Sequence, residues 1–276
     1  MDFPPVRSRL QASPHQRAEG RLDIALAALD GRTRLSRFYQ QGCLKARCLP
    51  ALGGPEVVSL NISGGIAGGD ALETRLEIGA GGKAVFTTQA AERVYRSLDE
   101  AARVKTSLFV GQDAHLAYLP QETILFNGFA LDRTLEIDLA AGASFIGVES
   151  LVFGRLAMGE VLNNGFLLDR INLRRQGHLI WRDVAKVGGD VSARLDWPGV
   201  GGQARAVASL VAVGPDAAAR LTRLSRALDG YVAGVSQHGD IVLLRLLAGE
   251  AATLRRAVEA ALTVLRDGAL PRVWQS

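Results

Sequence analysis

The 276-residue sequence is poor in the residues that build several common kinds of site. It holds two cysteines, Cys43 and Cys48, whose spacing on an extended strand would point them to opposite faces, so no disulfide framework is expected. Its four histidines lie far apart and form neither a His-x-His nor a His-Glu-x-x-His motif. A fixed zinc site of those types is therefore excluded.

Long apolar runs are also missing. None approaches the length needed to cross a bilayer, and none stands near the start of the chain, which together with the few cysteines predicts a cytoplasmic protein without a membrane partner. The formal charge is +4 and the pI is near 9.4. Lys and Arg nevertheless alternate with apolar residues, as in 103–105 and 170–174, so no nucleic-acid partner is expected.

The sequence divides into a tail and one domain. Pro4, Pro5 and Pro14 stand among polar residues and predict a flexible N-terminal tail over residues 1–20. No segment within residues 21–276 resembles a linker, so these residues are expected to form a single domain.

Polar and apolar residues alternate at a period of two in several segments, which is typical of half-buried strands. Segments 72–78 and 131–139 each lead through a turn of small residues into a second extended run, at 83–87 and 143–147. Two further pairs follow the same plan, and the unit recurs at about 30 residues. The predicted fold is mainly β, a β-helix-like stack of strand hairpins.

The C-terminal quarter changes period. Leucines and valines recur every three or four residues after Asp216, a plausible N-cap, and again from Leu254 to Leu265, which predicts two C-terminal α-helices. Between them, residues 241–247 form a nearly unbroken apolar run and predict a buried strand.

The glycine-rich segment 64–70 resembles a phosphate-binding loop only in part. It lacks the Gly-Lys-Ser or Gly-Lys-Thr ending of a P-loop, and an alternating strand pattern follows it where a dinucleotide loop would open a helix. Its glycines are therefore expected to allow a sharp turn or close backbone packing.

Five carboxylates stand in distinctive local sequences and are the candidate site residues: Asp70, Glu92, Glu122, Glu149 and Glu160. They fit three interpretations. Paired carboxylates catalyse glycoside hydrolysis, although aromatic residues, at 6%, are few for binding sugar rings. The carboxylates also suit structural ion pairs with Arg93, Arg96, Arg133 and Arg155. Alternatively, they line a polar passage that holds a divalent cation weakly. The residues alone do not rank the last two.

Several motifs in order resemble the UreD family of urease accessory proteins, called UreH in some organisms. They are NISGGIAGGD at 61–70, TTQAAERVYRS at 87–97, LPQETILF at 119–126, ESLVFGR at 149–155 and AMGE at 157–160. The resemblance covers about residues 40–185. Cys43 departs from it, standing where a proline is common.

The resemblance implies a β-helix-like fold over 21–276 and a non-catalytic role in the cytoplasm. Such proteins bind the urease apoprotein, join UreF and through it the GTPase UreG, and help to deliver nickel. Nickel is thought to pass through an internal tunnel, so the resemblance makes the five carboxylates candidates for transient nickel contacts, with no tightly bound cofactor. A carbohydrate-active β-helix enzyme and a simple nickel store remain as alternatives.

Overall fold

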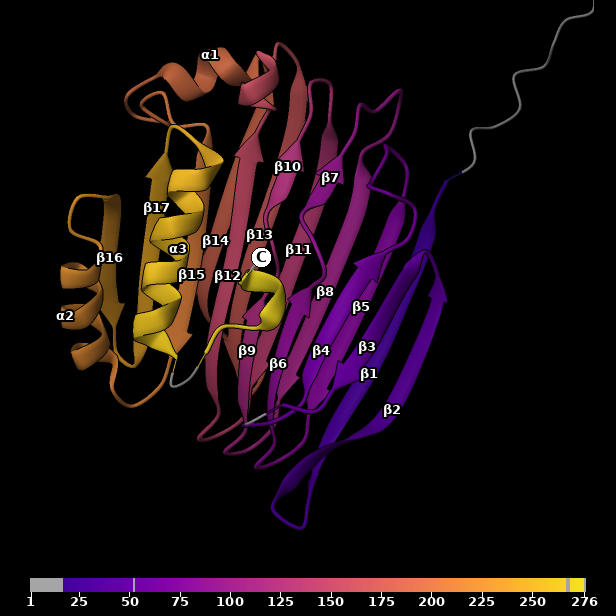
Figure 1. Ribbon diagram of the computed structural model, residues 1–276, viewed down its shortest axis with the longest axis vertical. Helices are drawn as coiled ribbons and strands as arrows, with labels where there is room; N and C mark the ends of the chain where they lie inside the picture. The colour runs from indigo at the N-terminus through magenta and orange to yellow at the C-terminus, as the bar shows by residue number, and fades with distance from the viewer. Residues whose placement is uncertain (1–16, 52, 267–268, 276) are drawn as a thin grey trace, which may run out of the picture.

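The computed structural model describes residues 17–51, 53–266 and 269–275, and its strands form two sheets packed face to face (Figure 1). The first sheet consists of β1 Glu19–Leu29, β2 Arg32–Gly42, β5 Ala71–Ile78, β8 Ala102–Val110, β11 Ala130–Leu139, β13 Gly165–Arg175 and β14 His178–Gly189. Their spatial order is β14-β13-β11-β8-β5-β1-β2.

The second sheet contains the remaining strands: β3 Leu44–Leu49, β4 Glu56–Asn61, β6 Lys83–Thr88, β7 Glu92–Val94, β9 His115–Leu119, β10 Thr123–Leu125, β12 Ser144–Phe153, β15 Ala206–Val213, β16 Val232–His238 and β17 Ile241–Ala248. Its main order is β16-β17-β15-β12-β9-β6-β4-β3. The short strand β10 pairs with both β12 and β7 beside this path.

Three consecutive strand pairs form the coils of a β-helix-like stack. In β5/β6, β8/β9 and β11/β12, the first strand lies in the first sheet and the second strand lies in the second sheet. Equivalent strands of successive coils pair in parallel, β5 with β8 and β8 with β11 in one sheet, β6 with β9 and β9 with β12 in the other. The predicted mainly β, β-helix-like stack is thereby confirmed.

The turn between two consecutive strands determines whether those strands pair with each other. Residues 79–82 connect β5 to β6 and carry the chain across the space between sheets, which is about 10 Å. Gln176 and Gly177 connect β13 to β14 with φ of 51° and 79°, the signs that a two-residue hairpin turn requires. Thus β13 and β14 pair with each other, antiparallel. Strands β5 and β6 do not pair with each other: β5 pairs with β1 and β8, and β6 pairs with β4 and β9.

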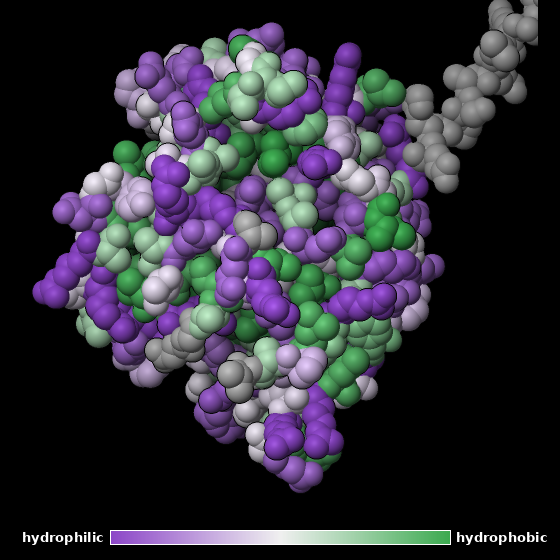
Figure 2. Space-filling view, in the orientation of Figure 1, coloured by the Kyte–Doolittle hydropathy of each residue, from purple (hydrophilic) through white to green (hydrophobic). Residues whose placement is uncertain are grey.

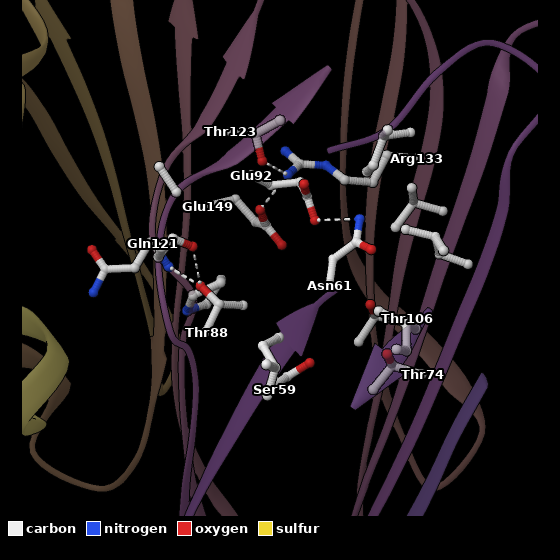
Figure 3. Close-up of a pocket in the computed structure, with 18 of the residues that line it drawn as sticks. Ser59, Asn61, Thr74, Thr88, Glu92, Thr106, Gln121, Thr123, Arg133 and Glu149 are labelled. Atoms are coloured by element: carbon white, nitrogen blue, oxygen red, sulfur yellow. Dashed lines mark hydrogen bonds and ion pairs between the residues drawn. The ribbon is translucent and has the colours of Figure 1, made fainter. Parts of the chain in front are cut away.

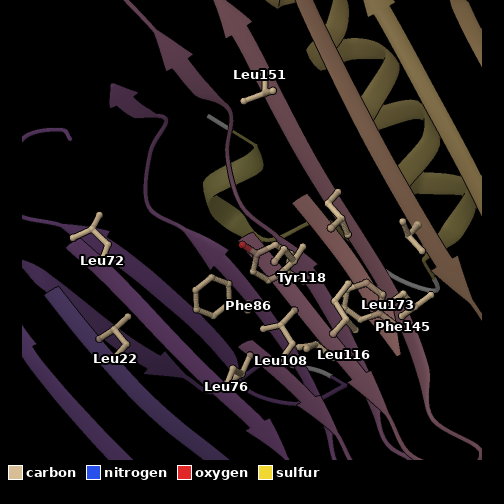
Figure 4. Close-up of a cluster of buried hydrophobic side chains, with 14 of the residues drawn as sticks. Leu22, Leu72, Leu76, Phe86, Leu108, Leu116, Tyr118, Phe145, Leu151 and Leu173 are labelled. Carbon is tan, nitrogen blue, oxygen red and sulfur yellow. The ribbon is translucent and has the colours of Figure 1, made fainter. Parts of the chain in front are cut away.

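Two apolar cores result. The larger one lies between the sheets, where Leu76, Leu108 and Phe145 are fully buried (Figure 4). The smaller one lies between the second sheet and the helices. Strand β12 contributes to both because alternate residues point to opposite faces, and its residues 145–153 are all buried.

The two predicted C-terminal helices are confirmed as α2 Ala217–Ala227 and α3 Ala251–Leu265. They lie on the second sheet, and the predicted buried strand is β17, adjacent to them (Figure 1). Asp216 precedes α2 but does not cap it with its side chain, which pairs with Arg220 and Arg223 instead. A shorter helix, α1 Val191–Asp196, and two 3-10 turns, Leu156–Met158 and Arg272–Trp274, complete the described elements.

On the face that carries α3, hydrophilic and hydrophobic side chains alternate over the surface (Figure 2). None of the helices in the described ranges is both long and apolar enough to cross a membrane. Cys43 and Cys48 are free thiols, as expected.

The predicted tail falls mostly outside the described residues, which begin at residue 17. Glu19 and Gly20, its last residues, already belong to β1. The boundary at residue 20 and the single domain over 21–276 stay predictions.

Candidate functional site

A cavity of about 270 Å³ lies between the two sheets, at a level where polar side chains interrupt the apolar core (Figure 3). Glu92 and Glu149 line this first cavity together. Hydroxyl and amide side chains also line it: Ser59, Asn61, Thr74, Thr88, Thr106, Gln121 and Thr123. Gly64, Gln89 and Ala90 at its rim are exposed, so the cavity reaches the surface of the molecule.

Three charged side chains meet at one end of the first cavity, and we call Arg133, Glu149 and Asp169 the buried triad. Nη1 of Arg133 lies 2.6 Å from Oε2 of Glu149. The same guanidinium donates through Nη2 and Nε to the two oxygens of Asp169, at 2.7 and 2.9 Å. All three residues are at most 8% exposed, so the triad is screened from solvent.

Strand register brings the triad together. Arg133 on β11 and Asp169 on β13 are register partners in neighbouring parallel strands. Each occupies an inward position of its strand, between Leu131 and Leu135 in one case and between Leu167 and Ile171 in the other. Glu149 comes from β12 in the opposite sheet, so the triad links the two sheets across their interface.

Two neutral side chains complete the environment of the triad. The hydroxyl of Tyr118 donates to Oε1 of Glu149 at 3.2 Å, and Nη1 of Arg133 donates to Oγ1 of Thr123 at 3.2 Å. Each polar atom of the triad therefore has a partner of suitable chemistry, which offsets the cost of burying charge.

A second cavity, of about 330 Å³, continues between the sheets toward β14, β15 and β17. Glu149 lines both cavities, whereas Arg133 lines only the first and Asp169 only the second. The triad is therefore the boundary between the cavities. Lys186 and Val200 at the rim of the second cavity are exposed, so this cavity reaches the surface beside the segment that follows α1.

Burial changes the acid–base properties of the triad. Burial raises the pKa of Glu149 to about 7, although the positive charge of Arg133 acts in the opposite direction. Burial alone would lower the pKa of Arg133, but the charges of Asp169 and Glu149 raise it above its usual value. Arg133 thus remains a cation, while Glu149 changes its charge near neutral pH.

Glu149→Gln is expected to remove part of the pH dependence of stability. Because the pKa of Glu149 is about 7 when folded and its ordinary value is 4.5, the folded state keeps a proton that the unfolded state releases. This contribution is complete below pH 4.5 and is lost as the pH rises through 7. Urea unfolding at about pH 5 and about pH 8 should show a pH effect smaller by roughly 2–3 kcal/mol in the variant. An equal change in the free energy of unfolding between the two pH values in both proteins would contradict this prediction.

Glu92 stands apart from the triad, on the side of the first cavity near β4. Its Oε2 accepts from the Asn61 amide at 3.3 Å and its Oε1 from the Arg93 N–H at 3.1 Å. Burial raises the pKa of Glu92, and these two hydrogen bonds oppose the change.

The other three predicted carboxylates line neither of these two cavities. Asp70 accepts from the backbone N–H groups of Ala18 and Ala67, both at 2.8 Å, and so fixes the turn that leads into β5. Glu122 pairs with Arg255 of α3 at 3.4 Å. These contacts hold backbone or helix in place.

Glu160 fixes the loop after β12. It pairs with Arg155 at 2.9 Å and accepts from the backbone N–H of Asn127 at 3.0 Å. The hydrogen bond from Arg155 lowers the pKa of Glu160. The structural ion pairs considered from the sequence are therefore present for Arg133 and Arg155.

The glycine segment 64–70 packs closely against segment 87–97. A Cβ on Gly65 would lie 2.3 Å from the Tyr95 ring, and one on Gly68 would lie 2.1 Å from Oγ of Ser97. The expectation of close packing is confirmed, and it joins segment 61–70 to segment 87–97.

Sequence reasoning missed Asp169 and treated Arg133 only as an ion-pair partner. The period of two offered the missing signal, because both residues stand in the inward register of their strands. Across the described ranges, no three His, Cys, Asp or Glu side chains are arranged to hold a metal ion. Within the described residues, Glu92 and Glu149 therefore line a cavity without forming a closed metal site.

Comparison with known proteins identifies the family. The family model described as UreD urease accessory protein matches residues 18–275. The urease accessory protein UreD of Chelativorans sp. (strain BNC1) is 43% identical over 95% of each chain. The UreD proteins of Xanthobacter autotrophicus and Rhizobium etli are 42% and 41% identical, covering 98% and 95% of this chain and 94% and 97% of their own. The chain therefore belongs to the UreD family of urease accessory proteins.

Proposed function

We propose that this chain is a cytoplasmic maturation factor that helps to assemble the nickel centre of urease. In this role it holds UreF, and through UreF the GTPase UreG, on the urease apoprotein and offers nickel a passage toward the active site. Membership of the UreD family supports the part in urease maturation. One observation carries the passage: two cavities, each reaching the surface, meet at the buried triad.

The lining suits a cation in transit. Glu92 lies in the first cavity, Glu149 at the boundary and Asp169 in the second, so a cation meets carboxylates at successive points. Oxygen ligands bind a borderline dication such as Ni²⁺ less tightly than His or Cys ligands, and none of the described residues that line these two cavities is a His or Cys. Nickel is the cargo here, and no tightly bound cofactor is proposed.

The passage therefore uses a different set of carboxylates from the five named in the sequence. Glu92 and Glu149 remain, and Asp169 and Asp183 of the second cavity are added. We assign Asp70, Glu122 and Glu160 to the structural contacts described above. Membership of a family of urease accessory proteins favours this role over that of a carbohydrate-active enzyme.

The test is co-expression with the urease subunits, UreF and UreG. Glu92→Gln and Glu149→Gln are expected to leave co-purification intact and to lower the nickel content of urease roughly ten-fold, the effect of about 1.4 kcal/mol of lost attraction for the cation. Nickel per urease active site is measured by elemental analysis of purified urease.

Glu122→Gln is the matched control, since it removes a carboxylate that lies outside both cavities. Its urease should contain the normal amount of nickel. Unchanged nickel in both Glu92→Gln and Glu149→Gln would rule out the passage. Failure of the unmodified chain to co-purify with UreF and urease would rule out the scaffold.

A further inference from the structure

The guanidinium of Arg133 lies where the two cavities meet. It contacts Glu149 from the wall of the first cavity and Asp169 from the wall of the second. A dication moving between the cavities meets the guanidinium at the carboxylate oxygens that it would bind. The guanidinium repels a dication at this short range, but with Glu149 ionised the whole triad carries one net negative charge. In the arrangement observed, the guanidinium therefore bars a dication by occupying these oxygens.

The charges of the triad also suggest how it opens. Ionised Glu149 and Asp169 carry two negative charges, which the single charge of Arg133 only half neutralises. A dication in place of the guanidinium would neutralise both. Two further oxygens already face this position, the hydroxyl of Tyr118 beside Glu149 and that of Thr123 beside Arg133. Carboxylate and hydroxyl oxygens of this kind are able to coordinate a divalent cation.

The first cavity has space for the Arg133 side chain when it leaves the triad. Its side chain already lines that cavity, which has a volume of about 270 Å³ and a wall of hydroxyl groups. Glu92 lines the same cavity and offers a carboxylate to a guanidinium that leaves the triad. The move exchanges one set of polar contacts for another, so it does not require an unpaired buried charge.

We propose that Arg133 is an exchangeable plug: it occupies the boundary between the cavities until a divalent cation displaces it and binds between Glu149 and Asp169. This inference rests on the proposed passage and adds its regulation. The plug explains how a carboxylate-lined passage remains closed to a cation until one arrives at high local concentration.

The experiment measures Ni²⁺ binding to the full-length chain alone, by equilibrium dialysis at a pH near 8. Arg133→Gln removes the competing charge and is expected to bind one Ni²⁺ roughly ten-fold more tightly than the unmodified chain. Adding Glu149→Gln to this variant should abolish the gain, since the cation then loses one of its two carboxylates. Equal affinity of Arg133→Gln and the unmodified chain would overturn the plug.

A milder variant keeps the test decisive if Arg133→Gln does not fold. Arg133→Lys retains the charge, but a compact ammonium cannot hold both carboxylates in the forked geometry of arginine. It is expected to bind Ni²⁺ more tightly than the unmodified chain by roughly three-fold. If folded Arg133→Lys matches the unmodified chain, the plug is likewise overturned.

Arg155→Gln is the matched control, because it removes an arginine from a carboxylate, Glu160, that lines neither cavity. Its Ni²⁺ affinity should be unchanged. The Ni²⁺-binding results can be told apart from the urease nickel results that test the passage. Tighter binding by Arg133→Gln with normal urease nickel in both Glu92→Gln and Glu149→Gln would keep the exchange site and reject the passage. The reverse pair of results would keep the passage and reject the plug.

Discussion

Arg133→Met is expected to lower the free energy of unfolding by about 3–5 kcal/mol at a pH where Glu149 is ionised. The variant leaves the carboxylates of Glu149 and Asp169 buried, close together and without their shared cation. Such an uncompensated charge pair is far more costly than the loss of an exposed salt bridge. Urea unfolding followed by circular dichroism at about pH 8 measures the difference.

Arg21→Met provides the control. Arg21 also lies on the first sheet and pairs with Glu73 at 3.9 Å, but both side chains are about half exposed, so this change should cost less than about 1 kcal/mol. Equal effects of the two substitutions would show that the triad does not carry its charges in a buried environment.

Replacing the whole triad with apolar residues should restore stability. Buried ion clusters exchanged for hydrophobic side chains of similar size are often as stable as the original or more so. The triple variant Arg133→Met, Glu149→Leu, Asp169→Leu should therefore unfold at least as late in urea as the unmodified chain. If nickel uses the proposed passage, the triple variant should also fail to deliver nickel to urease. A stable variant that delivers no nickel would separate the triad's role in function from its role in stability.

Ser209→Trp is expected to reduce the nickel content of co-expressed urease to about a tenth or less, because an indole ring would obstruct the second cavity, as apolar constrictions close pores. Ser209 lies on β15, lines the second cavity and is the register partner of Glu149. The cavity volume of about 330 Å³ gives the ring space without overpacking the core. Elemental analysis of purified urease measures the effect.

Ser107→Trp is the matched control. Ser107 lies on β8 between the buried Thr106 and Leu108, so its side chain points to the outer face of the first sheet. Both variants should co-purify with UreF and urease. Normal nickel delivery by a folded Ser209→Trp chain would show that nickel does not use the second cavity.

Much of the fold could be predicted from local pattern. The alternation in 131–139 predicts a strand with one buried face, and the three- and four-residue spacing after Asp216 predicts a helix with one buried face. The structure contains both elements, as β11 and α2. Pairing between strands could not be read in the same way. Strands β5 and β6 look like a hairpin in sequence, but the four-residue turn between them reaches the opposite sheet.

The candidate site was predictable only in part, because a cavity depends on contacts between distant segments. Glu92 and Glu149 were named from their local motifs, and both line the first cavity. Asp169 stands in no distinctive motif. It lies in the site because it is the strand-register partner of Arg133, 36 residues earlier in the chain. Asp70 and Glu160 stand in motifs as distinctive as those of Glu92, yet their oxygens hold backbone N–H groups.

The coils also set a length. The first cavity is lined from β5 and β8 to β11, and the second from β13 to β14, so the way from one to the other runs across successive strands of the stack. Neighbouring strands in a sheet are about 4.8 Å apart. Each strand in the stack therefore adds about 4.8 Å to the separation of the two openings, so the number of stacked strands sets how far apart the openings lie.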